Sequence, residues 1–266
     1  MALQDELKRN RSLKLHNGVF YQADLPKQND FELMYLSLRS KENRLYTDEI
    51  VKTLPKIPHN HVLEREWRVR SISSEKLISY LKRSLSCAKI LEVGCGNGWL
   101  ASKIASELSA DILAMDVNEA ELLQGARVFP SEQLSFLYGD IRGLNLKDIY
   151  FDCIVLASSV QYFPDLVALI KRLIKLLTPS GQIHIIDSPI YSSNEAIVAA
   201  RERSLRHFTS LGHPDLARFY FHHTKELIGI FNYTILEDPN SIVSIIKRQI
   251  FRSPHPVFPW IMIKAD

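Results

Sequence analysis

Short apolar runs alternate with amphipathic stretches through the middle of the chain. The runs are short enough to be strands buried on both faces of a sheet. Between them, Ala101–Leu108 and Leu166–Leu177 repeat apolar residues at helical intervals. This alternation of strand and helix predicts an α/β domain with a mainly parallel sheet. The predicted strands are 90–93, 112–115, 134–138, 151–157 and 182–187.

The first run ends in an acid that is followed by glycines at three alternate positions. The order is Glu92-Val93-Gly94-Cys95-Gly96-Asn97-Gly98. Glycines in a strand-to-helix turn permit backbone conformations and a close ligand approach that a side chain would prevent. A dinucleotide site usually has the spacing G-x-G-x-x-G, whereas this chain has G-x-G-x-G. The motif by itself fits a nucleoside site or a purely structural turn, and Glu92 fits either a ligand contact or a carboxylate that caps backbone amides.

Acids also follow the next two predicted strands. Asp116 ends the run 112–115, and Gly139-Asp140-Ile141 follows the run 134–138. The carboxyl ends of parallel strands meet at one edge of a sheet, where ligands bind. With the glycine loop, these strand ends resemble the cofactor site of the class I S-adenosylmethionine-dependent methyltransferases over about residues 88–188.

The resemblance implies a doubly wound, Rossmann-like, seven-stranded and mainly parallel sheet with S-adenosylmethionine as cofactor. In that family an acid at the position of Asp116 binds the ribose, and the pair Asp140 and Ile141 lies at the adenine. The segment after the fourth strand, with Gln161 and Tyr162, lies beside the methyl group and the acceptor. The implied cofactor-binding residues are Glu92, Gly94, Gly96, Gly98, Asp116, Asp140, Ile141 and Ala157.

Two extensions flank this core. In the family that the core resembles, segments at these positions commonly cover the acceptor cleft. Residues 1–86 contain helical patterns at 30–43, from Thr47, and at 64–85, and they predict a helical N-terminal extension. Residues 189–232 predict a helical insertion, with helices at 195–211 and 215–230. Residues 233–266 contain two strand patterns, 233–236 and 257–263, which would close the sheet as an antiparallel pair, while 241–251 fits either a helix or an edge segment.

A few residues in the extensions are candidates for acceptor contacts or catalysis. Tyr35, Arg39 and Asn43 are spaced four apart, so they line either a pocket or an ordinary solvated helix face. His222 and His223 lie in the second predicted helix of the insertion, where one is a candidate general base, as is Tyr162 if the acceptor is a hydroxyl.

Composition and charge limit the other function classes. The histidine spacings do not match a metal motif, and three cysteines without metal spacing favour reduced thiols. The net charge of +3 comes without a long basic patch. The segment after the fourth strand reads Ala157-Ser158-Ser159-Val160 and lacks the Asn/Asp-Pro-Pro-Tyr/Phe tetrad of nucleic-acid amino-methylating enzymes. We therefore expect no nucleic-acid partner. No long apolar span or secretory signal is visible, so we expect a cytoplasmic protein that does not enter a membrane.

The sequence therefore predicts an S-adenosylmethionine-dependent methyltransferase that acts on a small or medium-sized organic acceptor, mainly by positioning the reactants. Two alternatives from other classes stay open. One is a nicotinamide-dependent oxidoreductase, and the other is a non-catalytic interaction module with a methyltransferase-like fold. The acceptor, the methylated atom and the oligomeric state are not readable from the sequence.

Overall fold

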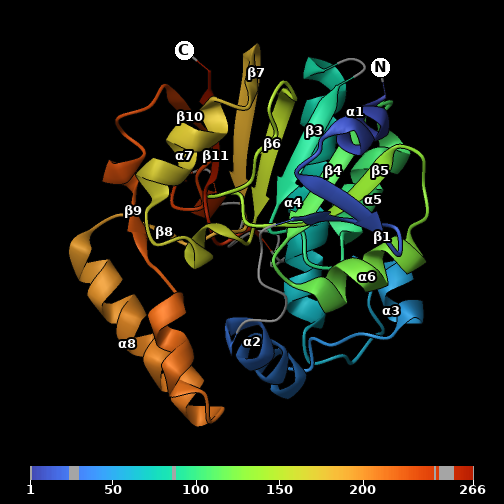
Figure 1. Cartoon of the computed structure of the whole chain (residues 1–266). Helices are drawn as coiled ribbons and strands as arrows, with labels where there is room; N and C mark the ends of the chain where they lie inside the picture. The colour runs from blue at the N-terminus through green and yellow to red at the C-terminus, as the bar shows by residue number, and fades with distance from the viewer. Residues whose placement is uncertain (1, 24–29, 86–87, 243, 246–254, 266) are drawn as a thin grey trace.

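The computed structural model describes residues 2–23, 30–85, 88–242, 244–245 and 255–265. Nine strands form one sheet in the order β1-β2-β5-β4-β3-β6-β7-β11-β10 (Figure 1). The sheet therefore has nine strands where the sequence predicted seven. The strands are β1 Leu13–His16, β2 Val19–Gln22, β3 Lys89–Val93, β4 Asp111–Asp116, β5 Leu134–Tyr138, β6 Phe151–Ala157, β7 Leu177–Ile186, β10 Tyr233–Glu237 and β11 Trp260–Lys264.

The central strands confirm the predicted doubly wound arrangement. Strands β2, β5, β4, β3, β6 and β7 are parallel to one another, whereas β11 pairs antiparallel with both β7 and β10. The chain order reverses between β3 and β6, so loops on opposite sides of this point diverge and leave a crevice at the carboxyl ends of the strands.

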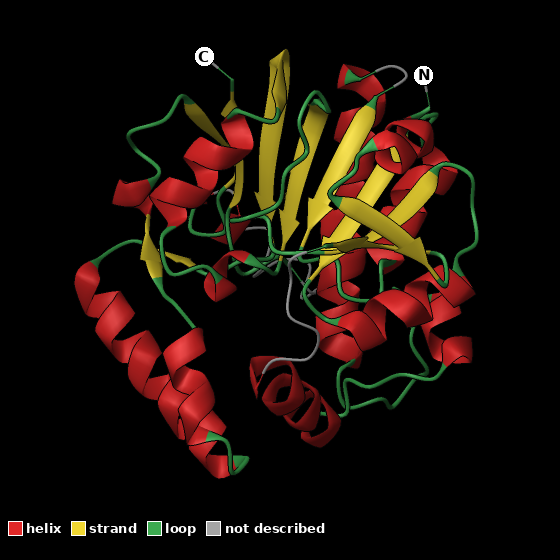
Figure 2. Cartoon of the chain, viewed as in Figure 1, coloured by secondary structure: helices red, strands yellow, loops and turns green. Residues whose placement is uncertain are grey.

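Helices cover both faces of the sheet (Figure 2). On one face, α1 (Leu3–Arg9) and α7 (Leu166–Ile174) pack in a core with Leu91, Leu113 and Ile154. On the other face, the core contains Ile90 and Ile112 with residues of three further helices. These are α4 Glu64–Ser84, α5 Trp99–Glu107 and α6 Glu119–Val128. Successive strand residues enter opposite cores, as the alternation of side chains along a strand requires.

Residues 13–22 extend the sheet, which corrects the prediction of an entirely helical extension. Strands β1 and β2 form an antiparallel hairpin, and β2 pairs in parallel with β5. Asn17 and Gly18 form its turn with φ angles of 48° and 78°, the left-handed conformation that a two-residue hairpin turn needs. Leu3 and Leu7 of α1 are buried in the core.

Helix α2 (Asp30–Lys41) of the N-terminal extension and helix α8 (Asn194–Ser210) of the insertion lie beyond the carboxyl edge of the sheet (Figure 1). The predicted helices near 30–43, after Thr47 and at 64–85 are present as α2, α3 Asp48–Thr53 and α4. The first predicted helix of the insertion is present as α8. The second predicted helix, 215–230, was wrong, because the chain there forms short pieces that leave His222 and His223 outside any helix. These pieces are η2 Pro214–Phe219, β9 His223–Thr224, which pairs with β8 Ile190–Tyr191, and η3 Lys225–Leu227.

The remaining predictions have mixed outcomes. The antiparallel closing pair is present as β10 and β11, while most of 241–251 lies outside the described residues. Cys95 and Cys153 are buried free thiols, and Cys87 lies outside the described part. None of the helices in the described ranges is long and apolar enough for a bilayer span. In the same ranges, no cluster of three or more His, Cys, Asp and Glu side chains is arranged to hold a metal ion.

Candidate active site

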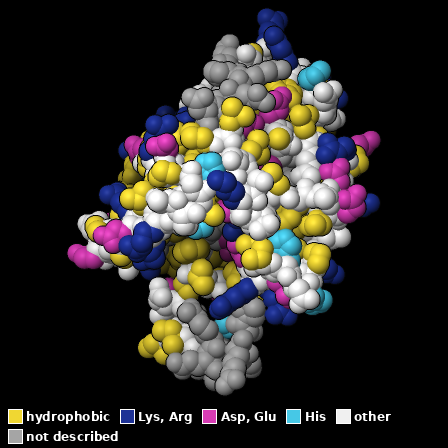
Figure 3. Space-filling model, turned by 90° about the horizontal axis from the view of Figure 1, so that it is seen from below, with side chains coloured by type: hydrophobic (Ala, Val, Ile, Leu, Met, Phe, Trp, Pro, Cys, Tyr) yellow, Lys and Arg dark blue, Asp and Glu magenta, His cyan; other side chains and the backbone are white. Residues whose placement is uncertain are grey.

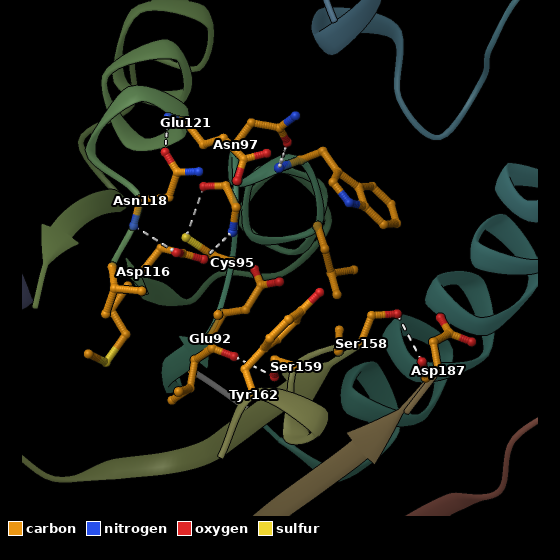
Figure 4. A pocket seen from close by; sticks show the side chains of 18 of the residues that line it. Glu92, Cys95, Asn97, Asp116, Asn118, Glu121, Ser158, Ser159, Tyr162 and Asp187 are labelled. Atoms are coloured by element: carbon orange, nitrogen blue, oxygen red, sulfur yellow. Dashed lines mark hydrogen bonds between the residues drawn. The ribbon is translucent and has the colours of Figure 1, made fainter. Parts of the chain in front are cut away.

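A cavity lies at the carboxyl edge of the sheet, beside the point where the strand order reverses (Figure 4). We call it the inner cavity. It combines the glycine loop after β3 with the ends of β4, β5, β6 and β7 and with one side of α2. Its lining includes Tyr35, Arg39, Glu92, Gly94, Gly96, Asp116, Glu121, Asp140, Ile141, Ala157, Ser158, Tyr162 and Asp187.

The three glycines of the loop have different surroundings, although all have positive φ angles. A β-carbon on Gly94 would lie 2.5 Å from Cβ of Ser159. A β-carbon on Gly96 would meet only Glu121 Oε2 at 3.4 Å, at the wall of the inner cavity. Gly98 does not line that cavity, so its predicted cofactor contact is not supported. The absence of a side chain at Gly98 instead allows close packing on Phe136. A β-carbon on Gly98 would lie 2.4 Å from Cε1 of that ring.

Asp116 fixes the glycine loop to the end of β4. Its Oδ2 accepts a hydrogen bond from the backbone N–H of Gly96 at 2.8 Å, and its Oδ1 accepts one from Asn118 N–H at 2.9 Å. Burial raises the pKa of this carboxyl, and the backbone hydrogen bonds oppose that effect. Asp116 is therefore held rigidly at the cavity wall, with lone pairs still free to accept from a ligand.

Two further buried carboxyls face the same cavity. Burial raises the pKa of Glu92 to about 8 and that of Glu121 to about 7, and the nearby Asp116 adds to both shifts. Oε2 of Glu92 is buried and has no hydrogen-bond partner among the described residues. A cationic group of a ligand placed beside Glu92, Asp116 and Glu121 would offset the desolvation and mutual repulsion of these carboxyls.

Asp140 and Ile141 lie at the far end of the inner cavity, after β5. The Asp140 backbone N–H donates to Gln22 Oε1 at 3.1 Å, and its side chain pairs with Arg142 at 2.6 Å. The added strand β2 thus positions the loop that carries both residues. An acid beside an apolar side chain suits a flat ring with an exocyclic amine.

The segment after β6 forms the opposite wall. Ala157, Ser158 and Tyr162 line the inner cavity, and the Tyr162 ring makes edge contacts with Tyr35 and Tyr220 at centroid distances of 5.8 Å. Gln161 does not line the inner cavity. It is buried, its Nε2 donates to Ser158 O at 2.6 Å, and it reaches a second hollow instead.

This second hollow, the outer cavity, has a volume of about 760 Å³ and is bounded by α2, α4, α8 and η2. That size is within the range of ordinary ligand pockets, about 300–1,000 Å³. The surface on the side of α2 and α8 is hollowed, with hydrophobic side chains inside and basic groups at the rim (Figure 3). Its lining includes Leu38, Arg65, Gln161, His207, Phe208, Tyr220 and Phe258.

The two cavities meet at six residues that line both: Arg39, Arg44, Arg70, Ser158, Tyr162 and Asp187. The arginines there are held in an ionic network. Arg44 makes a bidentate contact with Glu66 at 2.7 and 2.6 Å, and Glu42 contacts both Arg39 at 3.3 Å and His207 at 2.9 Å. The network joins α2, α4 and α8 across the outer cavity, so it sets the distance between the covering helices.

The candidate base role of His222 and His223 is not supported by their positions, since neither lines either cavity. Nε2 of His223 lies 3.3 Å from Val160 O and 3.0 Å from Phe163 O, so it donates to the loop after β6. Nε2 of His222 lies 3.1 Å from Ser204 Oγ of α8. Burial lowers the pKa of both imidazoles, which favours neutral packing side chains.

Glu121 and Asp187 are wall residues that the sequence analysis missed. Asp187 directly follows β7, so the rule that singled out Asp116 and Asp140 as strand-end acids applies to it too. Glu121 lies in the first turn of α6, beyond the strand end, and its place was not evident from strand patterns. Of the helix-face residues, Tyr35 and Arg39 line the inner cavity, whereas Asn43 lies beyond the end of α2.

Comparison with known proteins agrees with this geometry. Residues 90–181 match the model of a methyltransferase domain family. The chain is 32% identical over 95 residues to malonyl-[acyl-carrier protein] O-methyltransferase of Priestia megaterium, covering 35% of this chain and 34% of the relative. It is 29% identical over 97 residues to sterol 24-C-methyltransferase of Aspergillus fumigatus, covering 35% and 26%. The chain thus spans about a third or less of the length of these curated relatives.

Similarity of fold extends further than similarity of sequence. Magnesium protoporphyrin IX methyltransferase of Synechocystis, solved with bound S-adenosylhomocysteine, superposes with a TM-score of 0.55 over 88% of this chain and 98% of that one, at 12% identity. The shared arrangement includes the parallel strands and the helices on both faces. Residues 90–181 are therefore similar in sequence to a methyltransferase domain, and the chain has the fold of the class I S-adenosylmethionine-dependent methyltransferases.

Proposed function

We propose that the chain transfers a methyl group from S-adenosylmethionine, bound in the inner cavity, to a small or medium-sized organic acceptor in the outer cavity. The observation that carries this proposal is the junction of the two cavities. A cofactor site that opens directly into a second pocket is what group transfer between two bound molecules requires.

The inner cavity fits this cofactor in shape and charge. Asp116 is placed to accept from the ribose hydroxyls, and Asp140 with Ile141 is placed to bind the adenine. Gly96 leaves space where a side chain would fill the ligand's place. The cofactor carries a sulfonium and an ammonium group, which suit a cavity containing Glu92, Asp116 and Glu121.

When bound, S-adenosylmethionine supplies an activated methyl group for in-line displacement. The protein residues orient the reactants and exclude water, which accounts for most of the rate in a reaction of this kind. We propose that residues 30–63 and 189–232 form the cover that closes the outer cavity. Residues 3–22 are left out of the predicted cover because they join the sheet and its core.

The same charges argue against the two alternative classes. In an oxidoreductase the pyrophosphate of a nicotinamide dinucleotide would lie at the glycine loop, where the negative charge of Asp116, which binds the Gly96 N–H, disfavours it. A non-catalytic interaction module has no use for a second pocket beside the cofactor cavity. The acceptors named for the relatives, malonyl-[acyl-carrier protein] and a sterol, differ so widely that they do not identify an acceptor for this chain.

A transfer assay with methyl-labelled cofactor tests the proposal. The wild-type protein would be incubated with a panel of phenols, carboxylic acids, amines and activated carbon acids, and both the labelled product and S-adenosylhomocysteine would be measured. We expect at least one class to yield both in equal amounts. The matched control is Asp116→Ala, which should weaken cofactor binding by about 1–3 kcal/mol because a charged hydrogen-bond acceptor is removed. Equal product formation by this variant would contradict the assigned cofactor site.

A further inference from the structure

Asp187 has a backbone and a position unlike those of the other acids in the site. It follows β7 directly and has a left-handed φ of 49°. Its main-chain oxygen accepts a hydrogen bond from Ser158 Oγ at 2.9 Å, and Ser158 is also left-handed, with φ of 53°. Non-glycine residues in this region are strained and gather at functional sites. Here two of them stand side by side at the ends of the adjacent strands β6 and β7 (Figure 4).

The side chain of Asp187 is anchored on one oxygen only. Its Oδ1 accepts from Ser73 Oγ of α4 at 2.7 Å. Within the described residues, Oδ2 has no hydrogen bond and no ion pair. The positive charge of Arg70 lowers the pKa of Asp187, but the Arg70 guanidinium makes its ion pair with Glu66 at 3.0 Å. One carboxylate oxygen is therefore held in place and the other is available to a ligand.

Among the described residues, Asp187 is also the one carboxylate that lines both cavities. Glu92, Asp116 and Glu121 belong to the inner cavity, and Glu42 and Glu66 belong to the outer one. A group that receives a proton from the acceptor must reach the point where the two ligands meet. Neither His222 nor His223 reaches it, whereas Asp187 does.

We propose that Asp187 is a catalytic residue that accepts the proton from the acceptor atom undergoing methylation, so that the acceptor presents an O–H or N–H at that atom. The proposal rests on the proposed methyltransferase function. In the step, the oxygen or nitrogen forms a bond to the methyl carbon while the sulfur–methyl bond breaks and its electron pair stays on sulfur. The acceptor proton passes to Asp187 Oδ2, which becomes a neutral carboxylic acid.

The electrostatic surroundings agree with this role. Burial raises the pKa of Asp187, and the Ser73 hydrogen bond and Arg70 oppose the shift, while Glu66 and Glu237 add to it. A carboxylate with a raised pKa is a stronger base than one in water, and the proton that it receives is better retained.

The analogue sinefungin tests this contact without knowledge of the acceptor. In sinefungin a C–NH₃⁺ group replaces the sulfonium with its methyl, so its ammonium points to the place where the acceptor atom would lie. We expect wild-type protein to bind sinefungin about tenfold or more tightly than S-adenosylhomocysteine in calorimetry, because Asp187 accepts a charge-assisted hydrogen bond from that ammonium. In Asp187→Asn most of this preference should disappear, while the Kd of S-adenosylhomocysteine stays within about twofold.

The matched control is Asp148→Asn. Asp148 is also left-handed, with φ of 64°, but it is exposed and lines neither cavity, so its variant should keep the preference. Asp187→Asn should fold, because asparagine tolerates the left-handed backbone of residue 187. If it does not fold, Asp187→Gly removes the carboxylate and also tolerates that backbone. Two outcomes overturn the role of Asp187. In the first, Asp187→Asn still binds sinefungin more tightly than S-adenosylhomocysteine by the wild-type factor. In the second, the wild-type protein binds S-adenosylhomocysteine but shows no preference for sinefungin. Failure of the wild-type protein to bind either nucleoside overturns the proposed function itself.

Discussion

Gly98 lies so close to the ring of Phe136 that a β-carbon would come within 2.4 Å of the ring carbon Cε1. Gly96, two residues earlier, has no such neighbour, since its β-carbon would meet only the flexible end of Glu121 at 3.4 Å. The two glycines of one motif thus serve different purposes. One allows the loop and the start of α5 to pack on the sheet, and the other leaves space at the wall of the inner cavity.

Alanine at these two positions should therefore separate stability from binding. Gly98→Ala is expected to lower the free energy of unfolding by about 1–3 kcal/mol through overpacking, with about 1 kcal/mol more for its left-handed backbone. Gly96→Ala should lower the free energy of unfolding only by the roughly 1 kcal/mol that its left-handed backbone costs. It should weaken S-adenosylmethionine binding by about tenfold or more, because the methyl group occupies ligand space. Urea unfolding and calorimetry on both variants make the comparison, and the reverse pattern would show that the roles are wrongly assigned.

His223 is expected to be a packing residue. Its Nε2–H satisfies the carbonyl oxygens of Val160 and Phe163 in the loop that carries Tyr162. His223→Ala should lower the free energy of unfolding by about 1–3 kcal/mol because these buried acceptors lose their donor. His222→Ala removes a contact with Ser204 and should leave the turnover of folded protein within about threefold of wild type. A fall of about a hundredfold in rate with unchanged stability, in either variant, would restore that histidine as the base.

The stability of the ligand-free protein should fall as pH rises from 6.5 to 8. The native pKa values of Glu121 and Glu92, about 7 and about 8, exceed the value of 4.5 for an unperturbed Glu. In this window the native state consequently binds more protons than the unfolded chain, so a rise in pH favours unfolding. The lowered pKa values of His222 and His223 act in the opposite direction, but an imidazole of the unfolded chain, with its ordinary pKa of 6.5, has lost most of its protons by about pH 7.5, so the carboxyls dominate the upper part of the window.

Urea unfolding at several pH values measures this slope. Glu92→Gln and Glu121→Gln should each reduce it, because the amide does not titrate. Glu202→Gln, on the exposed surface of α8, removes a carboxylate without affecting the cavity and should keep the wild-type slope. Stability that is constant or rises through the window would mean that the buried carboxyls are already ionised.

The sequence brought together the strand-end residues of the inner cavity because their positions depend on local patterns. Buried runs located β3, β4 and β5, and each strand end carries its functional group within a few residues, as Glu92, Asp116 and Asp140 do. The hairpin of β1 and β2 also had a local signal, since Asn17-Gly18 between two short alternating runs is typical of a hairpin turn. That signal was overlooked when residues 1–86 were interpreted as helical.

The acceptor half was predicted poorly because it depends on contacts between distant segments. The stretch 215–230 has apolar residues at near-helical spacing, yet tertiary contacts decide its conformation, with β9 pairing to β8 and Phe221 N–H donating to Gln161 O at 2.7 Å. The expectation that one of His222 and His223 faces the cleft depends on that helix, which is absent. The outer cavity is lined by residues of α2, α4 and α8, which are far apart in the sequence, so no local pattern predicts its shape.

Calorimetry with the purified wild-type protein tests the central claim most directly. Three ligands would be titrated under the same conditions: S-adenosylmethionine, S-adenosylhomocysteine and NAD. We predict saturable one-to-one binding of both sulfur nucleosides at the inner cavity, and no measurable heat with NAD, whose pyrophosphate would face the negative charge of Asp116. Tight binding of NAD with no binding of either sulfur nucleoside would contradict the account.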